Sequence, residues 1–143
     1  MPQELFAGAS WSFEVWQNAE IPPIGSIVYT IWSAQGEFLY VGIAGSETSC
    51  PQGRINSHAS GVRSGDRFCM YVFDSLVTDH TIDPALRPID RTRQLDHRTR
   101  DYIRAHLAFR WHAADSRDEA AALELAIRAG AWQGSRPIIN PVN

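Results

Sequence analysis

Residues 26–43 of the chain read SIVYTIWSAQGEFLYVGI, and this stretch decides the fold. Two runs within it, 26–33 and 38–43, are rich in β-branched and aromatic residues, and the short segment 34–37, which contains a glycine, separates them. Residues of these types favour strands because their side chains pack well on a pleated surface. Two such runs around a short turn predict a β-hairpin.

The length of the hairpin loop fixes which residues face each other. A loop of two or four residues centred on 35–36 places Tyr29 opposite Gly42 and, in the same register, Tyr40 opposite Ile31. The two tyrosines are then diagonal neighbours on one sheet face, and Gly42 leaves space in front of the Tyr29 ring. An odd-length loop would turn the second strand over and separate the two hydroxyls. The tyrosines therefore either line one shallow pocket or pack under helices, as tyrosines in strands commonly do.

The remainder of the chain predicts a mixture of strands and helices around this hairpin. We expect, in chain order, a short helix at 53–63, a strand at 68–77, a surface helix at 90–106, a strand at 107–113 and a helix at 117–129. Ser116 and Glu119 form a capping box that opens the last helix, and Gly130 should close it. Because regular βαβ alternation is missing, the predicted fold class is α+β. It is a small central antiparallel β-sheet, made of the hairpin plus one or two further strands and flanked by helices.

The length of 143 residues fits one domain. Residues 1–24 end in a stiff, proline-containing stretch that delivers the chain into the first strand. We expect this N-terminal arm to pack on the domain through Trp11, Phe13 and Trp16. Residues 25–143 then form the domain itself.

Sequence features that mark membrane or secreted proteins are missing. No apolar run approaches the roughly 20 residues that cross a bilayer, so we expect no membrane partner. The first residues contain no basic region and no long apolar stretch, which argues against a secretory signal. Cys50 and Cys69 match no metal-binding spacing, so we expect a reducing, cytoplasmic location.

Charge is distributed unevenly along the chain. All 13 basic residues are arginine, and the formal net charge is -3. Residues 1–53 contain five acidic residues and no basic one, whereas residues 54–110 contain ten arginines and seven aspartates. The broad basic surface of many nucleic-acid-binding proteins is therefore excluded, and a phosphate-binding surface must be local. Six arginines between residues 87 and 104 either flank a nucleic-acid groove or form a solvated helix face. They are Arg87, Arg91, Arg93, Arg98, Arg100 and Arg104.

Two candidate sites come from helical spacing. Arg54 and His58 are four residues apart and hence share a helix face, where they offer a phosphate-binding guanidinium and a group that titrates near neutrality. The alternative is an exposed arginine beside a surface histidine. Glu124 is surrounded by apolar residues, so its carboxylate needs a cation. That cation is either Arg128, one helical turn away, or a hard divalent metal such as Mg²⁺.

Five fragments in this order resemble the signature of the GIY-YIG nuclease superfamily: Ile27-Val28-Tyr29, Tyr40-Val41-Gly42, Arg54-x-x-x-His58, Leu123-Glu124 and Pro137-x-x-Asn140. The first two look like the motif that names the family, with Ile27 in place of its first glycine. The third looks like the family's first-helix motif, and the last two look like its closing motif of a glutamate and an asparagine. The resemblance runs from residue 26 to residue 140, with residues 64–90 as an insertion.

The resemblance implies a GIY-YIG-like catalytic domain that acts as a metal-dependent endonuclease on DNA. It implies catalytic roles for six residues: Tyr29, Tyr40, Arg54, His58, Glu124 and Asn140. Tyr29 would activate water with help from Tyr40 and His58, and Asn140 would orient the glutamate or the phosphate. Glu124 would hold Mg²⁺ or Mn²⁺ and, together with Arg54, stabilise the phosphate. We assign Gly42, Arg63 and Arg67 to substrate binding.

Two other functions are compatible with the same residues. The chain could be a non-catalytic nucleic-acid-binding or repair-accessory module of the same fold, or an enzyme that acts on a small metabolite. For a nuclease, sequence-specific cutting of DNA would require either a homodimer or recognition by loops of this domain.

Overall fold

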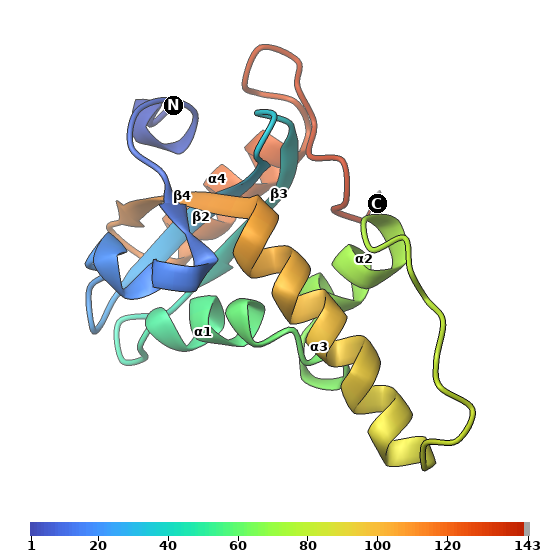
Figure 1. Cartoon of the computed structure of the whole chain (residues 1–143). Coiled ribbons are helices and arrows are strands. Elements are labelled where there is room, and N and C mark those ends of the chain that lie inside the picture. The colour runs from blue at the N-terminus through green and yellow to red at the C-terminus, as the bar shows by residue number, and fades with distance from the viewer. Residues whose placement is uncertain (142–143) are drawn as a thin grey trace.

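A four-stranded antiparallel sheet forms the centre of the structure, a computed structural model that describes residues 1–141 (Figure 1). The strand order is β1-β4-β2-β3. The strands are β1 (Trp11–Ser12), β2 (Ser26–Ser33), β3 (Phe38–Ala44) and β4 (Leu107–Ala114). The predicted α+β class and antiparallel sheet are confirmed, and the strand expected at 107–113 is β4.

Four α-helices and three short 3-10 helices accompany the sheet in the described part of the chain. The α-helices are α1 (Gln52–Ser60), α2 (Arg67–Ser75), α3 (Pro88–His106) and α4 (Arg117–Arg128). The 3-10 helices are η1 (Gln3–Leu5), η2 (Phe13–Ala19) and η3 (Arg63–Gly65). None of the helices in residues 1–141 combines the length and the apolar character needed to cross a membrane.

The hairpin of β2 and β3 has the predicted register in its main part. Tyr29 lies opposite Gly42, and Ile31 lies opposite Tyr40. Next to the turn, however, Trp32 lies opposite Phe38, so the expected loop of two or four residues is wrong. A shift of one residue between Ile31 and Trp32 restores the predicted pairing in the rest of the hairpin. Tyr29 and Tyr40 are therefore diagonal neighbours on one face, with ring centroids 6.4 Å apart.

The alternating side chains of β2 divide the core into two layers. Ile27, Tyr29 and Ile31 pack with residues of α1, α2, α3 and η2 on one face of the sheet. Val28 and Trp32 pack with residues of η1 and α4 on the other face. Figure 1 shows this arrangement, with α1, α2 and α3 on one side of the sheet and α4 on the other.

The strand predicted at 68–77 is wrong, because this segment forms helix α2. Its buried residues Phe68, Cys69, Val72 and Phe73 recur at helical spacing and cover one face of the helix. The side chain of Asp66 caps the helix by accepting a hydrogen bond from the backbone N–H of Cys69. The residues between 64 and 90 thus contribute a core-packed helix before a loop leads into α3.

The helix predicted at 53–63 ends earlier, at Ser60, because Gly61 adopts a left-handed conformation with φ of 72°. A Cβ atom at position 61 would lie only 2.6 Å from the Cα atom of Arg100, so glycine also permits the close approach of α3. The final helix begins as predicted, since Ser116 Oγ accepts a hydrogen bond from the backbone N–H of Glu119 at 3.0 Å.

Segments from both ends of the described chain lie against the sheet. In the N-terminal segment, Leu5 and Phe13 are fully buried, Trp11 and Trp16 are partly buried against the core, and β1 pairs with β4. Near the other end, backbone N–H groups of residues 138 and 139 donate to carbonyl groups of residues 38 and 39. Residues 138 and 139 therefore cover part of the outer edge of β3, the last strand of the sheet.

Three of the α3 arginines bind nearby chain segments. Arg91 donates hydrogen bonds to backbone carbonyl groups of residues 84 and 86 in the preceding loop. Arg98 donates to those of residues 79 and 81, and Arg104 donates to that of Ala59 at the end of α1. These three side chains hold the loop and α1 to α3.

Candidate functional site

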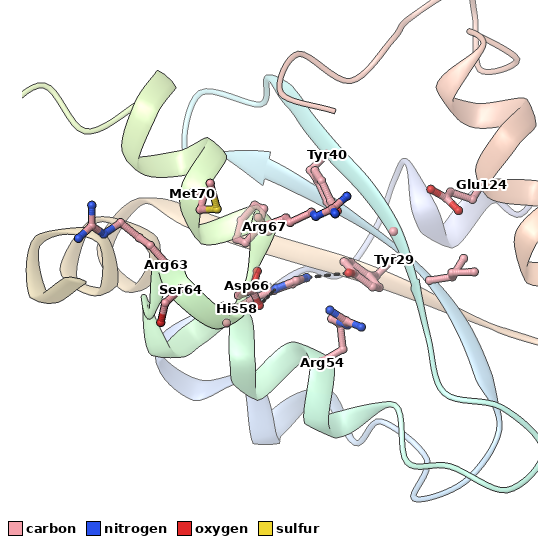
Figure 2. Close-up of a pocket in the computed structure, with 14 residues that line it drawn as sticks. Tyr29, Tyr40, Arg54, His58, Arg63, Ser64, Asp66, Arg67, Met70 and Glu124 are labelled. Atoms are coloured by element: carbon pink, nitrogen blue, oxygen red, sulfur yellow. Dashed lines mark hydrogen bonds and ion pairs between the residues drawn. The ribbon is translucent and has the colours of Figure 1, made fainter. Parts of the chain in front are cut away.

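A pocket of about 550 Å³ lies where the hairpin, α1, the start of α2 and α4 meet (Figure 2). Every site residue predicted from the sequence lines this pocket except Asn140. The predicted set that the structure brings together is Tyr29, Tyr40, Gly42, Arg54, His58, Arg63, Arg67 and Glu124. Residues on three α-helices, one 3-10 helix and two strands, many of them far apart in sequence, thus share one cavity.

Tyr29 projects from β2 beneath this pocket and is 1% exposed. Its ring occupies the space that Gly42 leaves open on β3. A Cβ atom at position 42 would lie 2.6 Å from Cζ of Tyr29 and closer still to its hydroxyl oxygen, so no larger residue fits opposite this ring. The hydroxyl lies 2.7 Å from Nε2 of His58, in hydrogen-bond contact.

His58 connects Tyr29 to a carboxylate that the sequence did not identify. Its Nδ1 atom lies 2.6 Å from Oδ2 of Asp66, and both side chains are 2% exposed. The second oxygen of Asp66 accepts the α2 capping hydrogen bond from the backbone N–H of Cys69 at 3.2 Å. Tyr29, His58 and Asp66 therefore form one buried hydrogen-bonded chain, which Figure 2 shows as dashed lines.

Burial and hydrogen bonding set the protonation states in this chain. Burial raises the pKa of Tyr29 well above its usual value, and the neighbouring Tyr40 adds to the effect. Burial also lowers the pKa of His58, against the opposing influence of Asp66. For Asp66, burial favours a higher pKa, but the hydrogen bond from His58 and other favourable contacts outweigh it and lower the pKa. At neutral pH the chain therefore consists of a phenol, a neutral imidazole and a carboxylate.

These states assign the hydrogen-bond donors. The Asp66 carboxylate can only accept, so the Nδ1–H of His58 donates to it. The unprotonated Nε2 of His58 then accepts a hydrogen bond from the hydroxyl of Tyr29. The lone pairs of the Tyr29 oxygen remain available to accept a hydrogen bond from the pocket side.

The neutral state of His58 predicts a pH-dependent stability. In the unfolded chain His58 takes up a proton near its ordinary pKa of 6.5, whereas the folded protein takes it up only at lower pH. The unfolded state thus binds more protons, so the free energy of unfolding should fall as the pH drops from about 7 to 5. Urea titrations over this range measure the effect. His58→Gln should flatten the dependence, and an equally steep curve for this variant would contradict the assignment.

Tyr40 lies beside this chain at the surface of the pocket. Its ring contacts those of Tyr29, His58 and Phe68, and the side chain is half-buried. Burial, followed by the charge of Asp66, raises the pKa of Tyr40 to about 12. Tyr40 is therefore a neutral phenol near neutral pH.

The three arginines of the pocket differ in their availability. The side chains of Arg54 and Arg67 are exposed and have no hydrogen-bond or ion-pair partner among residues 1–141. Arg63 instead pairs with Asp96 of α3 at 2.7 Å, and its guanidinium stacks over Phe73. Figure 2 shows Arg63 directed away from Tyr29, so Arg54 and Arg67 are the arginines free to bind an anion.

Glu124 enters the pocket from α4, and of the two cations considered for it the structure shows Arg128. Its carboxylate lies 3.5 Å from Arg128, the residue one turn later, and its side chain is 21% exposed. It also lines the cavity that holds Tyr29 and Arg54. Within residues 1–141, no group of three or more histidine, cysteine, aspartate or glutamate side chains is placed to hold a metal ion. A metal here would therefore depend on Glu124, substrate oxygens and water.

Asn140 lies outside the pocket, on the edge of the hairpin. Its side-chain oxygen accepts a hydrogen bond from the backbone N–H of Val41 at 2.8 Å, and its amide group donates to the Val41 carbonyl at 3.0 Å. The side chain thus pairs with β3 as a neighbouring strand would. Because Val41 separates Tyr40 from Gly42, Asn140 holds the strand that carries them.

The pocket therefore offers three chemical capacities. The chain from Tyr29 to Asp66 can accept a proton, Arg54 and Arg67 can bind anionic oxygens, and Glu124 can contribute a hard oxygen ligand. Comparisons of the chain with protein-family models, with curated proteins and with solved structures found no match.

Proposed function

We propose that the protein is a metal-dependent nuclease of GIY-YIG type that hydrolyses phosphodiester bonds of DNA. The observation that carries the proposal is the buried chain of Tyr29, His58 and Asp66 beneath a pocket with free arginines and a second carboxylate. Phosphodiester hydrolysis requires an activated water molecule, neutralisation of the phosphate charge and help for the leaving oxygen. Each requirement has a candidate group in this pocket.

Tyr29 is the group that activates water. Its hydroxyl donates to His58, so its lone pairs can accept a hydrogen bond from a water molecule in the pocket. As the water oxygen bonds to phosphorus and the bond from phosphorus to the leaving oxygen breaks, one proton of the water moves to the Tyr29 oxygen while the phenolic proton moves to Nε2 of His58. The leaving oxygen takes up a proton from solvent. This paired transfer avoids a free phenolate, which the raised pKa of Tyr29 would make costly. General-base catalysis of this kind typically contributes about 10²- to 10⁴-fold in rate.

Arg54 and Arg67 neutralise the phosphate. Both guanidinium groups lack protein partners among the described residues, so binding a phosphate breaks no ion pair seen there. A guanidinium can make two parallel hydrogen bonds to phosphate oxygens, which positions the phosphorus as well as stabilising it. Their contribution grows as negative charge builds on the phosphate in the transition state.

Glu124 is the proposed ligand for Mg²⁺ or Mn²⁺. The oxygen donor fits, because Mg²⁺ is commonly held by one or two carboxylates together with substrate phosphate and water. Asp66, the other carboxylate of the pocket, already uses both oxygens within the protein. When bound, the cation would stabilise the phosphate and the leaving oxygen. With a single protein carboxylate, we expect metal affinity to be low until the phosphate is present.

DNA is the proposed partner, and recognition would be confined to the pocket, because the net charge of -3 supplies no broad electrostatic attraction. We place the activity in the cytoplasm, where the free Cys50 and Cys69 would stay reduced. Sequence-specific cutting would require a homodimer or contacts from loops around the pocket.

A cleavage panel tests the proposal. The purified protein is incubated with single-stranded, duplex and branched DNA, and with RNA as a control, in Mg²⁺, in Mn²⁺ and in excess EDTA. We expect metal-dependent cleavage of at least one DNA substrate. Metal-independent binding without cleavage of any substrate would instead identify a binding module, and thermal stabilisation by nucleotides but not by oligonucleotides would identify a small-molecule enzyme.

A further inference from the structure

Asp66 stands at a junction between helix α2 and the proton-accepting chain. One carboxylate oxygen accepts the hydrogen bond from the backbone N–H of Cys69, and the other accepts that from Nδ1 of His58. The residue is 4% exposed and sits at the N-cap of α2. The helix terminus favours the negative charge and holds the carboxylate in place.

The two nitrogens of His58 face chemically different partners. Nδ1 faces Asp66, which can only accept a hydrogen bond, and Nε2 faces Tyr29, which can donate one. A neutral imidazole carries a single proton, and the group bound to one nitrogen decides where that proton resides. With its proton on Nε2, His58 would leave Oδ2 of Asp66 without a donor and could not accept the proton of Tyr29.

We propose that Asp66 is a positioning residue that fixes His58 in the form protonated on Nδ1, so that Nε2 can receive the proton of Tyr29. The catalytic part of this inference rests on the proposed nuclease function. In the proton balance, water gives one proton to the Tyr29 oxygen, and the phenolic proton forms a bond to Nε2. The resulting imidazolium carries protons on both nitrogens and lies 2.6 Å from the Asp66 carboxylate, which stabilises its charge.

No other charged group competes with Asp66 for the ring in the described residues. The titratable and charged groups that act on His58 are Tyr29 from β2, Tyr40 from β3, Arg54 from its own helix and Asp66 before α2. The remaining close aromatic neighbour, Phe68, is apolar and packs against the ring with centroids 4.6 Å apart. Asp66 is thus the only carboxylate among residues 1–141 that makes a hydrogen bond to His58.

Two substitutions separate this role from helix capping. Asparagine and serine are both good N-cap residues, so Asp66→Asn and Asp66→Ser keep a cap for α2. Serine is too short to replace the contact with His58. In Asp66→Asn one acceptor oxygen becomes an NH₂ donor. If this NH₂ group faces Nδ1 of His58, the His58 proton moves to Nε2. If it faces the backbone N–H of Cys69, two donors meet and the cap of α2 is weakened. Melting temperatures and circular dichroism report whether each variant is folded.

The first readout is the pH profile of single-turnover cleavage on a DNA substrate that the wild-type protein cuts. Both variants should cleave about 10- to 100-fold more slowly than wild type near pH 7. Their residual rate should rise with pH, because hydroxide replaces the missing proton acceptor. Cleavage at the wild-type rate, or a uniform reduction at every pH, would overturn the catalytic part of the inference.

The second readout does not depend on activity. In protein labelled with ¹⁵N-histidine, nitrogen chemical shifts identify which imidazole nitrogen carries the proton, and His58→Gln assigns the resonance. We expect wild-type His58 to be protonated on Nδ1 and Asp66→Asn to shift the proton toward Nε2. Wild-type His58 protonated on Nε2, or an unchanged pattern in both Asp66→Asn and Asp66→Ser, would overturn the positioning role. If the wild-type protein cleaves no DNA, the nuclease proposal is refuted. The nitrogen chemical shifts then still decide whether Asp66 fixes the protonation of His58.

Discussion

Replacing the phenol of Tyr29 by a phenyl ring, Tyr29→Phe, is expected to lower the rate of DNA cleavage by about 10²- to 10⁴-fold. The variant removes the oxygen that receives the proton of water but keeps the ring that packs opposite Gly42. It also leaves Nε2 of His58 without its hydrogen-bond donor, at a cost of about 1–3 kcal/mol in stability. Single-turnover cleavage rates and urea titrations of the variant measure the two effects.

Tyr40→Phe is the matched control for this substitution. Tyr40 lines the same pocket, but its hydroxyl makes no hydrogen bond to the described residues. We therefore expect less than about a tenfold loss of rate, in keeping with an assisting role. A larger loss in Tyr40→Phe than in Tyr29→Phe would show that Tyr40, and not Tyr29, activates the water.

The second large effect is expected for Glu124→Gln, which should lower metal-dependent cleavage by about 10²- to 10³-fold. The amide keeps the size of the side chain but removes the negative charge that would bind Mg²⁺. Raising the Mg²⁺ or Mn²⁺ concentration should recover part of the activity if the loss is one of metal affinity. Metal titrations of the cleavage rate provide the measurement.

Arg128→Gln separates the two roles available to Glu124. This substitution removes the partner of Glu124 in the ion pair. The side chains of Arg128 and Glu124 are each about one-fifth exposed. If the pair is all that Glu124 provides, both substitutions should lower stability by a similar amount, below about 1 kcal/mol, and neither should affect cleavage. The metal role instead predicts that Arg128→Gln retains cleavage and Glu124→Gln does not. Equal cleavage by the two variants would contradict it.

The sequence predicted the hairpin side of the site because local rules determine it. Strand propensity located β2 and β3, and Gly42 lies opposite Tyr29 as predicted. Loop length alone does not set this register, because the pairing next to the turn is offset by one residue and an irregularity after Ile31 corrects it. The spacing of Arg54 and His58 likewise placed both on the pocket side of α1. Local rules therefore place each pair on one face, whereas only the resemblance to the nuclease family suggested that the two faces meet.

The part of the site formed by Asp66 and the start of α2 was not predicted, because this segment was assigned as a strand. A short apolar run such as 68–73 suits a strand or a buried helix, and periodicity separates the two poorly. Recognising Asp66 as an N-cap, three residues before Cys69, would have favoured the helix. Assigning a strand there concealed Asp66 as the partner of His58, although only eight residues separate the two.

Other assignments depended on contacts between distant segments. The guanidinium of Arg63 is engaged by Asp96, which lies 33 residues later in the chain. Asn140 binds the backbone of Val41, 99 residues earlier, and therefore supports β3 from outside the pocket. Residue type and local spacing contain no information about either partner, so only the folded structure separates free side chains from engaged ones.

The most direct test of the proposed site is a crystal structure of Tyr29→Phe grown with Mn²⁺ and a short DNA substrate, since this variant should retain the groups that bind metal and phosphate. We predict an anomalous Mn²⁺ peak beside the carboxylate of Glu124 and a backbone phosphate contacted by Arg54. DNA bound elsewhere on the protein, with no Mn²⁺ beside Glu124, would contradict a nuclease site in this pocket.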